Sequence, residues 1–155
     1  MFFIGRFTLV WIIWLIFADK KRWRELFPTA IFAGLLGSIT DNIMDFYKLW
    51  DYNDNIIAKE LLVIFDDLGI YIVSTYLFIQ WLPKEKNFKN LFKYILSWTT
   101  ITLSIEAIHI YTGHMYHYNF WNLGWSYLAD WLLFFLFYFF YKQFQFDKLN
   151  TVTNS

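Results

Sequence analysis

Five long apolar segments, separated by short charged or polar connections, constrain the fold of this chain more than any other feature. They lie at about residues 2–18, 26–48, 60–82, 91–111 and 121–141. Each is close to the roughly 20 residues that a helix needs to cross a hydrocarbon core about 30 Å thick. Of the 155 residues, 58% are hydrophobic and 25% aromatic, which exceeds the roughly 45–50% apolar content of soluble domains. We therefore predict an all-α polytopic membrane protein, with a five-transmembrane-helix bundle over residues 1–142 and a polar cytoplasmic tail over residues 143–155.

Lysine and arginine are distributed unequally between the two ends of these segments. Three lie at the end that holds the N-terminus, namely Arg6, Lys48 and Lys59. Ten lie at the other end: Lys20, Lys21, Arg22, Arg24, Lys84, Lys86, Lys89, Lys93, Lys142 and Lys148. Positive residues are retained on the cytoplasmic side of a membrane. We therefore expect the N-terminus outside, the C-terminus in the cytoplasm and a multi-pass location in a cell membrane, the cytoplasmic membrane of a bacterium.

The composition also excludes several classes of function. The formal net charge is zero, so there is no overall basic surface for nucleic acid. The chain has no cysteine, which excludes disulfides, thiolate metal sites and cysteine nucleophiles. Two glycines of the second segment, Gly34 and Gly37, are expected to let a neighbouring helix approach closely.

Carboxylate side chains lie within the apolar segments rather than at their ends. Ending the second segment before Asp41 would leave only residues 26–40, and starting the fifth after Asp130 would leave only residues 131–141. Both remainders are too short to cross a bilayer. The predicted site is a layer about 10–12 Å below the outer boundary, made of Asp41, Asp45, Asp66, Asp67, Glu106, His109 and Asp130. Because adjacent helical residues point in different directions, only one of Asp66 and Asp67 is expected to point fully into the centre.

This layer requires a source of positive charge. His109 is expected to be its only potential cation, because no Lys or Arg is expected at that depth. Uncompensated anions in a low-dielectric interior are not tenable. Bound protons, a metal ion, an organic cation or access to water would each compensate them.

A metal is one of these alternatives, and it has a specific sequence fragment. Glu106 and His109 form an E-x-x-H pair, the spacing that supplies a carboxylate and an imidazole to one ion in carboxylate-bridged helix bundles. The remaining ligands of the predicted Zn, Mn or Fe site would be Asp41, Asp66 and Asp130. His114 and His117 have two interpretations, an access site for the ion or an ordinary aqueous loop.

Several stretches are similar to a family of small, functionally uncharacterised multi-pass integral membrane proteins of endospore-forming bacteria. They are the basic connection DKKRW at residues 19–23, FDDLGIY at residues 65–71 and the aromatic WNLGWSYLADW at residues 121–131. The resemblance covers most of the chain. It implies five membrane spans with acids inside them, and it implies no reaction.

Three functions follow as alternatives. The leading hypothesis is binding of a cation, either a divalent metal or a cationic small molecule, or of protons, in a cluster that opens to the outer face, for transport or sensing. The second is a membrane-embedded enzyme acting on a lipid or isoprenoid, with Asp or Glu as general acid and base. The third is a structural or partner subunit of a membrane complex or homo-oligomer. In all three the expected surroundings are the lipid bilayer.

Overall fold

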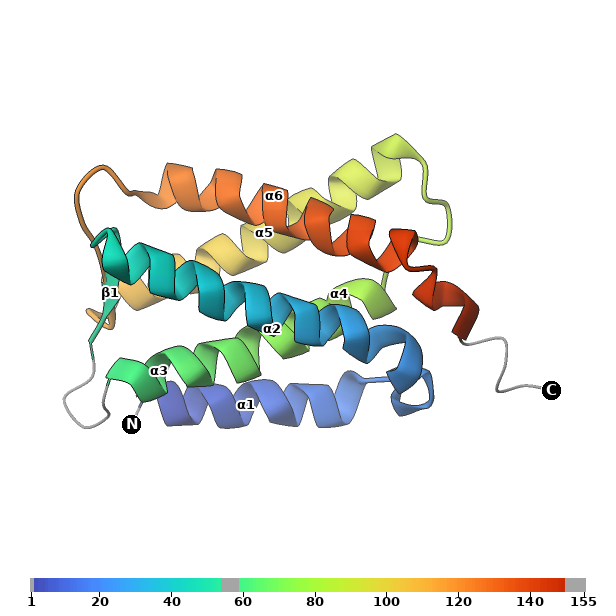
Figure 1. Cartoon of the computed structure of the whole chain (residues 1–155), viewed down its shortest axis with the longest axis horizontal. Coiled ribbons are helices and arrows are strands. Elements are labelled where there is room, and N and C mark those ends of the chain that lie inside the picture. Colours follow the sequence, from blue (N-terminus) through green and yellow to red (C-terminus); the bar gives the residue numbers. More distant parts are fainter. Residues whose placement is uncertain (1, 54–58, 150–155) are drawn as a thin grey trace.

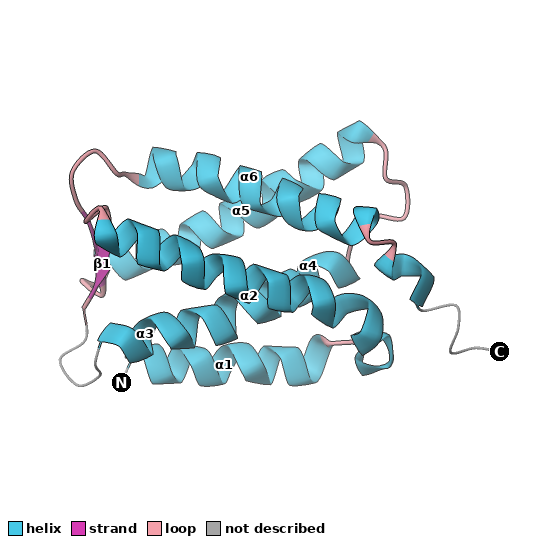
Figure 2. Ribbon diagram, viewed as in Figure 1, coloured by secondary structure: helices cyan, strands magenta, loops and turns pink. Residues whose placement is uncertain are grey.

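The computed structural model describes residues 2–53 and 59–149, which form a helical bundle with one small two-stranded ribbon (Figures 1 and 2). The elements are α1 (Phe2–Phe17), η1 (Lys20–Arg22), α2 (Trp23–Phe46), β1 (Trp50–Tyr52), α3 (Lys59–Phe65), η2 (Asp66–Tyr71), α4 (Ile72–Gln80), α5 (Phe88–Tyr111), β2 (Met115–His117) and α6 (Leu123–Gln143). The helical stretches begin and end close to the five apolar segments, with α3, η2 and α4 together occupying the third.

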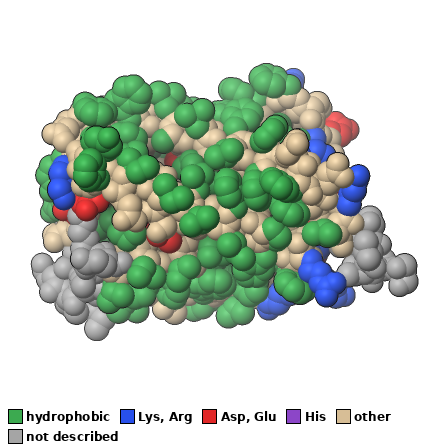
Figure 3. Space-filling model, viewed as in Figure 1, with side chains coloured by type: hydrophobic (Ala, Val, Ile, Leu, Met, Phe, Trp, Pro, Cys, Tyr) green, Lys and Arg blue, Asp and Glu red, His purple; other side chains and the backbone are tan. Residues whose placement is uncertain are grey.

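Within residues 2–53 and 59–149, three helical stretches are long and apolar enough to cross a membrane. They are Lys20–Phe46, Leu61–Gln80 and Leu123–Gln143, while Phe2–Phe17 is apolar but shorter. Hydrophobic side chains cover most of the visible face between the two ends of the bundle, and Lys and Arg gather mainly at one end (Figure 3). These features are consistent with a membrane protein.

Strands β1 and β2 join the α2–α3 and α5–α6 connections at the end of the bundle that holds the N-terminus (Figure 1). They are antiparallel, with Trp50 opposite His117, Asp51 opposite Tyr116 and Tyr52 opposite Met115. Beyond the strands, the Tyr118 N–H donates to the Leu49 carbonyl (2.8 Å). The sequence predicts only helices and loops here. The ribbon forms because the two connections lie side by side and pair backbone groups that would otherwise lack partners. We call this the ribbon end.

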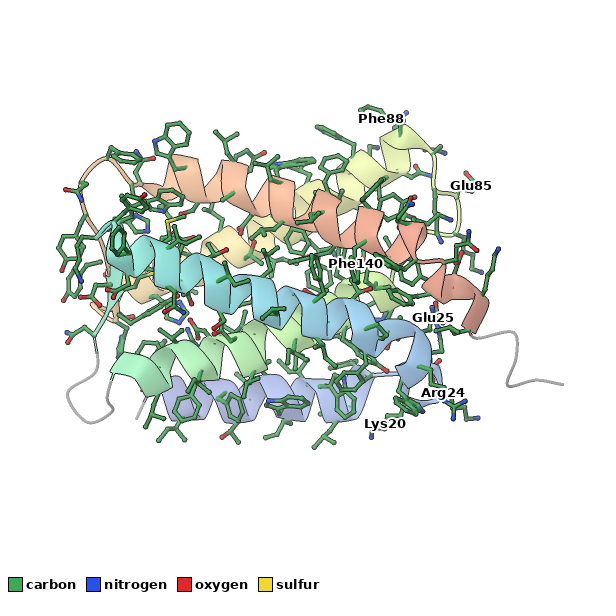
Figure 4. All side chains as sticks on the ribbon, viewed as in Figure 1. Lys20, Arg24, Glu25, Glu85, Phe88 and Phe140 are labelled. Carbon is green, nitrogen blue, oxygen red and sulfur yellow. The ribbon has the colours of Figure 1, made fainter. Side chains whose placement is uncertain are left out.

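The opposite end carries most of the basic residues, and we call it the basic end. Lys20 of η1 and Arg24 and Glu25 of the first turn of α2 lie there (Figure 4). The buried Glu25 carboxylate accepts two hydrogen bonds from Arg22, from Nε to Oε2 (2.8 Å) and from Nη2 to Oε1 (2.6 Å). The Tyr141 hydroxyl also donates to its Oε1 (2.5 Å). This charge-assisted network fixes the first turn of α2 to the last turn of α6.

Close packing of α2 against the third helical segment confirms the expectation for Gly34 and Gly37. A Cβ at Gly37 would lie 2.8 Å from the Tyr71 ring, and a Cβ at Gly34 would lie 3.1 Å from the Asp67 backbone oxygen. Any larger side chain at these positions would force the two segments apart.

The third segment is interrupted by the π-helical turn η2, between α3 and α4. Such a turn uses i→i+5 bonds, widens the helix and is frequent at functional sites. Here it leaves both Asp66 and Asp67 buried. Asp66 pairs with Arg6 of α1, whereas Asp67 lies against Ser38 of α2.

Aromatic side chains fill the bundle toward the basic end. Phe78 is fully buried, and its ring centroid lies 5.3 Å from that of Tyr94 and 4.8 Å from that of Phe134. Rings at these separations make favourable contacts in addition to the apolar area they bury. The bundle is therefore packed tightly at this level.

Candidate ligand-binding cavity

A cavity of about 150 Å³ lies between the aromatic core and the ribbon. Phe134 and Phe137 line it on the core side, and Tyr52 and Met115 line it on the ribbon side. Its acidic and basic side chains come from four elements, α1, η2, α5 and α6: Arg6, Asp66, Glu106, His109 and Asp130. Four of the seven side chains of the predicted layer therefore meet on one cavity.

Arg6 is the basic residue that the sequence interpretation misplaces. From sequence alone it is expected at the outer boundary, with His109 as the only cation of the layer. In the structure the Arg6 guanidinium pairs with Asp66 and also donates to His109 Nε2. His109 Nδ1 donates to the Ile105 carbonyl (2.6 Å). A ring that accepts at one nitrogen and donates at the other is neutral, so Arg6, and not His109, supplies the positive charge.

Glu106 faces away from His109, toward the ribbon and α6. Its Oε1 accepts from His117 Nε2 (2.8 Å) and from the Ser126 hydroxyl (2.6 Å). The Trp121 indole N–H in turn donates to Ser126 Oγ (3.0 Å). Burial lowers the pKa of His117 below its usual 6.5, which favours the neutral ring. His117 thus supports Glu106, which lines the cavity, and it is not a side chain of a free aqueous loop.

Asp130 lies deeper along α6, facing α5. The Thr102 hydroxyl of α5 donates to its Oδ2 (2.6 Å). Tyr52 lines the ribbon side of the cavity. Burial, and next the negative charge of Asp41, raise the pKa of Tyr52 well above its usual value. Its hydroxyl therefore stays protonated and can donate.

The other three acids of the predicted layer lie elsewhere. Asp41 and Asp67 are buried between α2 and η2, outside the cavity lining. Asp66 is thus the member of the adjacent pair that lines the cavity. Asp45 does not belong to the site: its side chain is 46% exposed, and it pairs with Lys48 (3.2 Å) at the end of α2. Asp45 shares a helical face with Asp41, but it lies in the last turn of α2, which reaches the bundle surface.

The metal set expected from sequence is not assembled. Among the described residues, no group of three or more His, Asp or Glu side chains could hold a metal ion. Glu106 and His109 share one helix, but Glu106 bonds to β2 and α6 while His109 bonds to α1. The guanidinium of Arg6 occupies the faces of Asp66 and His109 that a metal would need. The predicted Zn, Mn or Fe centre is therefore not formed by these side chains.

Several residues of the cavity are missed by sequence reasoning. A lone arginine in an apolar segment was a signal for Arg6, because such a residue seeks a partner inside the bundle. Nothing local indicates Tyr52 or Met115, since only strand pairing between two distant connections brings them to the cavity.

Comparisons with known proteins add no further constraint. The chain matches no protein-family model, no curated protein and no solved structure. The cavity itself therefore carries the functional argument.

Proposed function

We propose that this is an integral membrane protein that binds a small organic cation in the cavity, for transport or sensing. One observation carries the proposal, namely that acids outnumber bases on a single cavity. Asp66, Glu106 and Asp130 line it. Arg6 is engaged by Asp66, and within the described chain no Lys or Arg pairs with Glu106 or Asp130. A cation would supply the charge that buried carboxylates need.

The remaining walls favour an organic cation. Tyr52, Tyr71, Trp50 and Trp121 all line the cavity. Faces of such rings attract ammonium groups through their quadrupoles, and the carboxylates of Glu106 and Asp130 would fix the charged group. A concave, largely aromatic site with a few convergent polar groups is also typical of small-molecule pockets.

A membrane topology belongs to the same proposal. Five spans would place the ribbon end outside and the basic end in the cytoplasm, in agreement with the uneven distribution of Lys and Arg. The cavity would then open toward the outer face. Because the chain has no cysteine, single cysteines can report this without background. Asn119→Cys should react with a membrane-impermeant maleimide in intact cells, whereas Lys86→Cys should react only after lysis, and the reverse result would contradict the topology.

Ligand binding can be tested through tryptophan fluorescence, since Trp50 and Trp121 line the cavity. Purified protein in detergent would be titrated with a series of primary and quaternary alkylammonium ions at about pH 7.5. We expect saturable quenching that Asp130→Asn and Glu106→Gln weaken by at least about tenfold, equal to about 1.4 kcal/mol. Asp45→Asn, on the exposed end of α2, is the matched control and should bind as wild type. If none of the ions shows saturable binding, the proposal is contradicted, and carboxyls that carry protons become the favoured explanation.

The carboxyl–imidazole pair supports a second candidate function. Glu106 and His117 are hydrogen bonded (2.8 Å) beside an aromatic cavity. Such a pair can take a proton from one carbon of an apolar substrate and return it to another. The candidate is therefore a membrane enzyme that isomerises a lipid or isoprenoid. Lipid extracted from the purified protein should then contain an unsaturated compound whose turnover, but not binding, is lost in Glu106→Gln.

A further inference from the structure

Asp41 and Asp67 form a second pair of buried carboxyls, between α2 and η2. Asp41 is 3% exposed and Asp67 is 5% exposed. Neither lines the cavity, so the proposed organic cation does not account for them. Asp67 is the charged group that acts most strongly on Asp41, ahead of Arg6, which acts with the opposite sign. The two carboxyls therefore lie close enough to repel each other if both are ionised.

The packing of α2 explains why they approach. Gly34 lets the Asp67 backbone come within 3.1 Å of the position that a Cβ would occupy. One turn further along α2, Ser38 lies against the Asp67 side chain. Asp41 follows on the same helical face, since residues three and four apart are neighbours on a helix.

Three oxygens of this pair lack donors. No described residue makes a well-aligned hydrogen bond to either carboxyl oxygen of Asp41 or to Asp67 Oδ1. The Trp50 indole N–H approaches Asp41 without forming such a bond. Arg6 is engaged by Asp66 and His109. Buried polar atoms are nearly always satisfied, so these oxygens point to a bound species.

Protonation of one carboxyl would still leave a buried polar atom of this pair without a partner. A neutral Asp41 would carry an O–H group, and a buried O–H group needs an acceptor. Even if Asp67 Oδ1 accepted from this O–H group, the second oxygen of Asp41 would still lack a partner. A cation between them would contact all three oxygens and reduce the repulsion between the two carboxyls.

We propose that Asp41 and Asp67 bind a sodium ion between α2 and the π-helical turn. Irregular backbone inside membrane helices commonly supplies carbonyl oxygens to Na⁺, and η2 lies directly beside the two carboxyls. Divalent ions fit less well: Ca²⁺ takes six to eight oxygens and Mg²⁺ needs nearly ideal octahedral geometry, whereas this site has two carboxyls and one hydroxyl from side chains. The site is distinct from the cavity, although the charge of Asp41 acts on Tyr52 and Tyr71, which line it.

Thermal unfolding of purified protein in detergent, followed by tryptophan fluorescence, tests this. NaCl would replace KCl at constant total concentration, so that only the identity of the ion changes. A ligand that binds only the folded state raises the unfolding midpoint. We expect Na⁺ to raise it by about 3 °C or more, and we expect Asp41→Asn and Asp67→Asn to abolish the rise. Asp130→Asn, in the cavity, should keep it.

Binding of ²²Na⁺ to the same variants gives a second readout that does not depend on stability. Retained alkylammonium binding by Asp41→Asn and Asp67→Asn would show that these variants are folded. If Na⁺ leaves the wild-type midpoint unchanged and no ²²Na⁺ binds, the sodium site is disproved, whatever the cavity binds. If Asp130→Asn loses Na⁺ binding together with the other variants, the site is not the Asp41–Asp67 pair, and the proposal fails in that case too.

Discussion

His117 Nε2 lies 2.8 Å from Glu106 Oε1, so that one side chain of the ribbon is bonded to helix α5 of the bundle. The bond links two features that the sequence presents separately, an acid inside an apolar helix and a histidine in a connection. It fixes β2 over the cavity, and it makes the ribbon end sensitive to the protonation of one imidazole.

The first prediction concerns pH. Because burial lowers the pKa of His117 below 6.5, the unfolded chain takes up a proton before the folded protein does as the pH falls. Stability from this group is therefore complete above about pH 7.5 and decreases as the pH falls through 6.5 and below. The groups that face the His117 ring are Glu106 of α5 and Trp50, which lies opposite His117 in the ribbon. Between about pH 7.5 and 5.5, the unfolding midpoint should fall more in wild type than in His117→Asn. His114→Asn, in the same connection, should keep the wild-type slope, and an equal slope in His117→Asn would contradict the assignment.

The second prediction concerns the buried ion pair. Arg6→Leu should destabilise the protein by about 3–5 kcal/mol, because it leaves the Asp66 carboxylate buried without its counter-charge. Adding Asp66→Leu should recover most of that loss. Chemical unfolding of both single variants and the double variant gives the coupling energy. The exposed pair Lys48–Asp45 is the control, and its coupling should stay below about 1 kcal/mol. Additive single effects at Arg6 and Asp66 would mean that the two side chains do not depend on each other.

The third prediction concerns helix packing. Gly37→Ala would place a methyl group 2.8 Å from the Tyr71 ring, and it should cost about 1–3 kcal/mol. Gly5→Ala meets nothing within 4 Å on α1, so it should be neutral or slightly stabilising, since alanine favours a helix over glycine. Unfolding midpoints of the two variants, measured side by side, decide between these outcomes. Equal effects would show that α2 does not pack on η2 as described.

The fourth prediction concerns the basic end. Tyr141→Phe removes the hydroxyl that donates to Glu25 (2.5 Å), and it should destabilise the protein by about 1–3 kcal/mol because that acceptor is buried. Tyr111→Phe is the control, because Tyr111 is 93% exposed and should change stability by less than about 0.5 kcal/mol. Hydrogen exchange at the last turn of α6 should rise only in Tyr141→Phe, and unchanged exchange there would contradict a role in holding α6 to α2.

The helices could be predicted from sequence because apolar runs of that length have few alternatives. The carboxylates Asp66, Glu106 and Asp130 could be placed in one interior for a related reason, since charged groups in apolar helices avoid the outside of the bundle. Arg6 could not be placed correctly, because an arginine near a segment end can reach either the boundary or a partner inside. The ribbon depends on pairing between residues 50–52 and 115–117, which short sequence windows do not reveal. The π-helical turn likewise reflects packing against α1 and α2 more than any local preference.

That turn also restricts how the length of the chain can change. Removing one residue from Asp66–Tyr71 would let α3 and α4 run together as a continuous α-helix, with one half rotated by about 100° relative to the other. If α4 kept its core contacts, Asp66 would turn away from Arg6; if Asp66 kept Arg6, Tyr76 would leave the core. Insertions and deletions are therefore tolerable in the connection at residues 81–87 but not inside η2. In related chains, the spacing between Asp66 and Tyr76 should be invariant even where the loops differ in length.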